Sequence, residues 1–88
     1  MRITVDLSLY PLADDYLPRI VAAIKALEAA SGVEVIVNQM STQLRGEAVD
    51  VMQAIAGLID SSFADGTPQS LVAKILNADL PIGQTPEL

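Results

Sequence analysis

The chain has 88 residues, 51% of them hydrophobic, and a formal net charge of −6 at pH 7. This length suits one domain with a single core, and the excess of acidic residues disfavours nucleic acid as a partner. The chain has no His and no Cys, so it lacks the usual general base, thiol nucleophile and zinc ligands and cannot form disulfides. A binding protein is therefore favoured over an enzyme, and we expect neither a metal ion nor a cofactor.

The first half of the chain predicts a strand, a helix and a second strand. Apolar and polar residues alternate from residue 2 to Pro11, which ends the first strand. The alternation places on the polar face Arg2, Thr4, Asp6, Ser8 and Tyr10. A helix follows, with Pro18 in its first turn and Gly32 as its stop signal. The β-branched run at residues 33–37 predicts the second strand.

The second half predicts two further strands with a helix between them. A turn at residues 38–40 leads into a short strand at residues 41–45, which we expect Gly46 to break. The second helix begins near Glu47, whose carboxylate favours the positive end of the helix dipole. After an Asp-Gly-Thr-Pro turn, residues 70–76 predict the fourth strand.

The element order β-α-β-β-α-β predicts an α+β, ferredoxin-like sandwich with a four-stranded antiparallel sheet and two helices on one face. We expect residues 1–80 to form this ligand-binding domain and residues 81–88 to form a loose C-terminal tail. The other face of the sheet is then uncovered, which makes it a natural place for a ligand or a second subunit. Small domains often gain stability by association, so we expect a homodimer or homotetramer.

Several segments, spread over about residues 2–81, carry a family resemblance. They are Ser8–Leu12, Asn38, Met40–Thr42, Arg45–Glu47 and Asn77–Pro81, with LYPL and STQLRGE the most specific stretches. In their order and spacing these segments resemble the YkoF-type thiamine- and hydroxymethylpyrimidine-binding family. The resemblance implies a ferredoxin-like domain that binds thiamine or its pyrimidine precursor without catalysis, in vitamin uptake or salvage. Some family members carry two tandem domains, so a second subunit would supply the neighbour that this single-domain chain lacks.

Six polar or aromatic residues are our candidate ligand contacts. They are Asp6, Ser8, Tyr10, Asn38, Ser41 and Thr42. Thiamine offers an amino group, ring nitrogens, a hydroxyl and a cationic ring, which need acceptors, hydroxyl or amide partners and apolar walls. Asp6 would accept from the amino group or balance the positive charge, and the hydroxyl and amide side chains would bind the ring nitrogens. Tyr10 would stack on a ring or give a cation–π contact.

Each candidate also has a structural alternative. Asp6 could pair across the strands with Arg2 or Lys74. Asn38 could simply supply a turn conformation with positive φ. The hydroxyl groups of Ser41 and Thr42 could serve to close that turn and not to bind a ligand. Tyr10 could cover the edge of the core.

Two other functions stay open. One is a regulatory or structural homo-oligomeric domain of the same topology without a vitamin ligand. The other is an enzyme acting on phosphate esters, with Arg45 and the start of the second helix holding the phosphate. The enzyme is disfavoured because no Gly-rich loop precedes the first helix, where Asp14 and Asp15 would repel an anion. No apolar run approaches the roughly 20 residues of a membrane span, and a cytoplasmic protein is the simplest interpretation.

Overall fold

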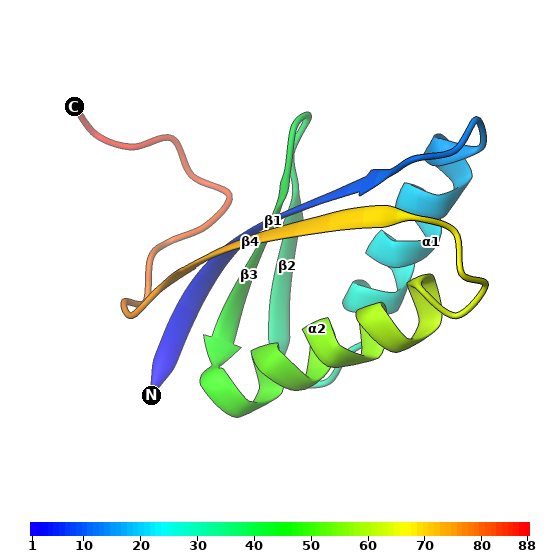
Figure 1. Cartoon of the computed structure of the whole chain (residues 1–88). Helices are drawn as coiled ribbons and strands as arrows, with labels where there is room; N and C mark the ends of the chain where they lie inside the picture. Colours follow the sequence, from blue (N-terminus) through cyan, green and yellow to red (C-terminus); the bar gives the residue numbers. More distant parts are fainter.

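The computed structural model describes all residues from 1 to 88 and has the predicted order of elements (Figure 1). The elements are β1 (Arg2–Pro11), α1 (Tyr16–Glu28), β2 (Val33–Val37), β3 (Thr42–Glu47), α2 (Ala48–Ser62) and β4 (Gln69–Leu76). The four strands form one sheet in the order β2-β3-β1-β4, and every neighbouring pair is antiparallel. Both helices pack on the same face of this sheet. The predicted ferredoxin-like α+β fold is confirmed.

The core lies between the helices and one face of the central strands. In β1 the alternation predicted this face correctly, because Ile3, Val5 and Leu7 are at most 4% exposed. The buried hydrophobic cluster comprises Ile3, Val5, Leu7, Ala23, Leu27, Leu44, Val51, Ile55 and Leu58. A fully buried Val or Leu side chain contributes about 1.5–3 kcal/mol relative to an exposed one. This cluster therefore fixes the position of both helices on the sheet.

Gly46 has a different role from the one expected. It does not break the third strand, because β3 continues through it to Glu47 and pairs it with Ile3 on one side and Val33 on the other. A Cβ at Gly46 would lie 2.6 Å from the carbonyl oxygen of Gly32, a separation that real Cβ atoms essentially never show. Glycine is required here because the chain before β2 approaches the β3 backbone closely.

The sheet face that the helices leave open is partly covered by the C-terminal segment, residues 77–88. Thr4 on this face is only 7% exposed, and it hydrogen-bonds the backbone of Ala78 and Leu80. Further along, Gly83 lies against the side chain of Ile36 in β2, and Ile82 is only 8% exposed. The segment thus packs against the sheet through these residues, so the face that the sequence predicts as uncovered is partly covered.

Candidate functional site

The end of β1 has no strand beside it on the side of β3. Its pairing with β3 stops at Leu7, opposite Thr42, whereas its pairing with β4 continues to Pro11, opposite Gln69. From Ser8 onward, backbone N–H and C=O groups on the β3 side are therefore outside any strand pairing. Such groups can bind the polar edge of a small molecule.

A cavity of about 210 Å³ lies in this region, between the end of β1, the turn from β2 to β3, and α1. Apolar side chains from the strands and from α1 form part of its wall: Leu7, Leu9, Ile20, Ile24 and Val37. Five of the six predicted contacts also line it: Ser8, Tyr10, Asn38, Ser41 and Thr42. Sites for drug-sized ligands usually measure about 300–1,000 Å³, so this cavity suits a single heterocyclic ring.

Asp6, the sixth predicted residue, does not line the cavity but is hydrogen-bonded to Ser41, which does. The Ser41 hydroxyl donates a hydrogen bond of 2.7 Å to the Asp6 carboxylate. In the sheet Asp6 lies opposite Gln43 on β3 and Lys74 on β4, and these three residues border a second hollow of about 290 Å³. Asp6 therefore lies between the two hollows. Its hydrogen-bond partner is Ser41, not the Arg2 or Lys74 of the structural alternative.

Thr42 approaches the cavity from the other side of the sheet. It lies opposite Leu7 in the β1–β3 register, so its side chain shares the helix-facing side with that buried leucine. Thr42 is 8% exposed. The cavity is thus lined from both faces of the sheet, at the end of β1, and not from the open face alone.

The turn residues have definite structural roles. The Asn38 N–H donates to the Ser41 carbonyl at 2.8 Å, and the Ser8 hydroxyl donates to the Met40 carbonyl at 3.4 Å. No residue other than glycine has a positive φ, so the proposed left-handed conformation of Asn38 is wrong. Tyr10 is 54% exposed at the cavity, so its ring is free to cover a bound ring. These side chains are accessible for binding without a change in the turn.

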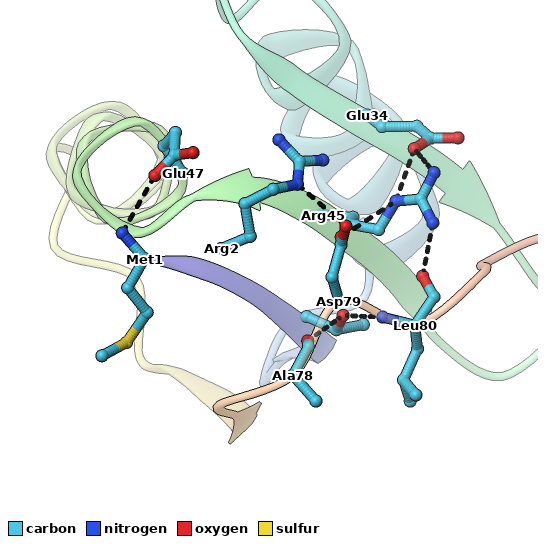
Figure 2. A network of polar contacts seen from close by, with 9 residues as sticks. Met1, Arg2, Glu34, Arg45, Glu47, Ala78, Asp79 and Leu80 are labelled. Carbon is cyan, nitrogen blue, oxygen red and sulfur yellow. Dashed lines mark hydrogen bonds and ion pairs between the residues drawn. The ribbon is translucent and has the colours of Figure 1, made fainter.

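Arg45 is engaged in a network that leaves little room for a phosphate (Figure 2). Its guanidinium lies 2.6 Å from the Glu34 carboxylate, donates to the Leu80 carbonyl at 2.7 Å, and lies 3.6 Å from Asp79. Asp79 also accepts a 3.0 Å hydrogen bond from Arg2. Two carboxylates beside the guanidinium oppose the binding of an anion, which argues against the phosphate-ester enzyme.

The resolved pKa shifts belong to an ion-pair cluster that joins α1 to the turn before β4. The Thr67 N–H and the Arg19 guanidinium donate to Asp65 and hold its pKa below the ordinary value. Hydrogen bonds to Asp15 and Asp65 raise the pKa of Arg19. These groups do not line the cavity, so we assign them to the stability of the fold.

Each of the other main hollows is lined by at most one of the six predicted contacts. A wider groove of about 470 Å³ runs between α1 and α2, but it holds none of the six predicted contacts, and small side chains such as Ala26, Ala54 and Gly57 line much of it. No group of three or more His, Cys, Asp or Glu side chains could hold a metal ion. Neither helix has the length and apolar character needed to cross a bilayer.

Solved structures from several organisms share this arrangement. A protein from Thermotoga maritima, provisionally assigned to thiamine biosynthesis or salvage, matches with a TM-score of 0.76 and 20% identity over 98% of this chain and 90% of that one. A Streptococcus pneumoniae protein matches with a TM-score of 0.82 and 21% identity over 91% and 90%. A domain of unknown function, DUF77, from Bacillus cereus gives 0.75 and 22% over 93% and 84%. These likenesses establish the class: a ferredoxin-like α+β domain.

The sequence defines the family more closely. The model of the YKOF-related family matches residues 2–68, and the chain belongs to that family. No curated protein matches the sequence. The family resemblance read from the LYPL and STQLRGE segments is thereby confirmed.

Proposed function

We propose that this protein binds thiamine, or the hydroxymethylpyrimidine moiety of thiamine, without catalysing a reaction. The site is the cavity between the end of β1 and the β2–β3 turn. The observation that carries the proposal is that five of the six contacts predicted for such a ligand line this one cavity, and the sixth is bonded to one of them. Membership of the YKOF-related family and the fold shared with the Thermotoga maritima protein support the choice of ligand.

The groups at the cavity match the pyrimidine ring. The ring packs against the apolar wall formed with Ile20 and Ile24 of α1, and its amino group donates toward Asp6 and Ser41. The ring nitrogens take the remaining hydroxyls and the unpaired backbone groups of β1. The volume of about 210 Å³ holds one ring, so the thiazolium of thiamine lies at the mouth, beside the exposed Tyr10.

The test is isothermal titration calorimetry with thiamine and with hydroxymethylpyrimidine. We expect saturable binding of at least one compound. Asp6→Asn should weaken it by about 10-fold or more, because hydrogen bonds to charged groups contribute about 1.5–3 kcal/mol. Ser41→Ala should weaken binding in the same direction. Ser31→Ala, an exposed position in the other groove, is the matched control and should bind like the wild type.

Two results would contradict the proposal. One is no heat and no thermal shift with either compound up to millimolar concentration. The other is unchanged affinity in both Asp6→Asn and Ser41→Ala, which would remove this cavity from the site. A role in vitamin uptake or salvage in the cytoplasm is part of the same proposal. A stable oligomer that binds neither compound would favour the regulatory or structural alternative.

A further inference from the structure

A row of three polar side chains crosses the middle of the open sheet face. Lys74 of β4 and Gln43 of β3 lie directly opposite Asp6 of β1, one on each side. The three line the hollow of about 290 Å³ together with Thr4, Val5, Leu76 and Leu80. This open-face hollow adjoins the C-terminal segment, because Leu80 of that segment forms one wall and is held there by Arg45 (Figure 2).

The ammonium group of Lys74 has no partner within the chain. Opposite charges that face each other on neighbouring strands attract, yet the Lys74 ammonium forms no ion pair with Asp6 or with any other carboxylate. On the other side of β1, the Ser41 hydroxyl donates to one oxygen of the Asp6 carboxylate and so turns it toward the β2–β3 turn. A cation and an anion that are not paired with each other therefore border one hollow.

The other side chains of the open-face hollow supply further contacts for a small molecule. The side-chain amide of Gln43 forms no hydrogen bond within the chain, and it offers both donors and an acceptor. Leu76 is 42% exposed and Leu80 is 46% exposed, so the hollow has an apolar wall that is open to water. A ligand that covers this wall removes apolar surface from water, which favours binding.

We propose that the open-face hollow binds a free α-amino acid with an apolar side chain. The ammonium group of the amino acid donates to Asp6 and to the side-chain oxygen of Gln43, and its carboxylate accepts from Lys74. Its side chain packs on Leu76 and Leu80. A zwitterion suits this hollow because the hollow itself presents one negative and one positive charge.

Ligands with a single kind of charge match the hollow less well. A carboxylic acid without an amino group would bring a second carboxylate close to Asp6, and the net charge of −6 on the chain adds to this repulsion. An amine without a carboxylate would bring a second cation close to Lys74 and leave both ammonium groups without an anion between them. The presence of both charges in one small molecule is therefore the property that distinguishes the ligand.

The open-face hollow is distinct from the vitamin cavity. Lys74, Leu76 and Leu80 line the hollow, and none of them lines the cavity. Asp6 borders the hollow and is linked to the cavity through Ser41. The amino-acid site goes beyond the proposed vitamin function and does not depend on it. Its test therefore targets Lys74 instead of Asp6 and contains no vitamin, so that its failure is distinct from failure of the vitamin proposal.

An NMR titration of the isotope-labelled protein with L-leucine tests the proposal. We expect saturable shifts of the backbone amide signals of Asp6, Gln43 and Lys74, with a Kd in the millimolar range or below, because the hollow is open to water on one side. L-Leucinamide lacks the carboxylate and isocaproate lacks the ammonium group, so each should bind about 5-fold more weakly or worse. Glycine, which lacks the apolar side chain, should also bind more weakly than L-leucine.

Lysine variants separate this site from a general effect of charge. Lys74→Met removes the ammonium group but keeps a long side chain, so it should weaken L-leucine binding by about 5-fold, whereas Lys74→Arg should retain binding. Lys25→Met is the matched control, because Lys25 is exposed on α1, forms no ion pair, and its loss changes the net charge equally. This control should bind L-leucine like the wild type.

Three results would overturn the proposal. The first is the absence of saturable shifts at these three amides with millimolar L-leucine. The second is equal affinity for L-leucine in Lys74→Met and in the wild type. The third is binding of L-leucinamide or isocaproate as tight as that of L-leucine, which would show that the hollow does not select a zwitterion.

Discussion

Replacement of Thr4 by Val should detach the C-terminal segment from the sheet without disturbing the core. The Thr4 hydroxyl donates to the Ala78 carbonyl at 2.7 Å and accepts from the Leu80 N–H at 3.0 Å. Valine has nearly the same shape but can make neither hydrogen bond. The change therefore removes two polar contacts and opens no cavity.

The expected cost follows from these two bonds. A typical hydrogen bond within a protein contributes about 0.5–1.5 kcal/mol, so losing two lowers the free energy of unfolding by about 1–3 kcal/mol. The other contacts of the segment, from Arg45 to the Leu80 carbonyl and from Arg2 to Asp79, are more exposed and hold it less firmly. We therefore expect Leu80 to open locally before the whole domain unfolds.

Urea unfolding and amide hydrogen exchange measure the two effects. Thr4→Val should lower the unfolding midpoint and speed exchange at the Leu80 amide. Thr42→Val is the matched control: Thr42 is also a buried threonine of this sheet, but its hydroxyl makes no contact with the segment, so the change should be below about 0.5 kcal/mol. Equal destabilisation by the two variants, with unchanged exchange at Leu80, would show that the Thr4 hydrogen bonds do not hold the segment on the sheet.

Two further predictions concern backbone space and charge. Gly46→Ala should destabilise the fold by more than about 2 kcal/mol in urea unfolding, because its Cβ would meet the Gly32 carbonyl at 2.6 Å. Gly57 lies in α2, and a Cβ there would meet open space, so Gly57→Ala should raise the free energy of unfolding by about 0.5–1 kcal/mol. An equal loss of stability in both glycine variants would contradict this explanation. The lowered pKa of Asp65 means that its ionised form stabilises the fold above its ordinary pKa of 3.8, and that this stability is lost as the pH falls through the lower folded-state pKa. The destabilisation by Asp65→Asn should therefore be largest at neutral pH and should shrink as the pH falls below 3.8. A difference independent of pH would exclude the ion pair as its cause.

The fold could be predicted because its signals are local. Alternation in β1 identifies a buried face from the side chains alone, and its apolar residues Ile3, Val5 and Leu7 belong to the observed core. Gly46 shows where local reasoning fails. The sequence marks Gly46 as a position where the backbone is constrained. The constraint itself comes from the carbonyl oxygen of Gly32, which lies beside Gly46 only in the folded sheet.

The sequence allowed the polar residues of the candidate site to be named, but not the shape of the cavity that they line. The polar groups at the end of β1 and in the β2–β3 turn stood out by their chemistry. Ile20 and Ile24 did not, because apolar residues on a helix are expected in the core and only the packing of α1 brings them to the cavity. The register decides that Thr42 faces the helix side, and one residue more or less in the turn would have reversed it. The cover formed by residues 77–83 depends on contacts such as Thr4–Leu80, for which the sequence carries no periodic signal.

The position of β1 in the sheet also orders the events of folding. Of the four strands β1 is synthesised first, but its pairing on one side is completed only by β4, which is synthesised last. Thr4 of β1, for example, lies opposite Leu76 of β4. Pairings between such distant segments are slow to form. Until β4 leaves the ribosome, β1 is itself an edge of the sheet, and its backbone N–H and C=O groups on that side can pair with other nascent chains. Completion of β4 therefore ends the period in which this chain is most prone to aggregate.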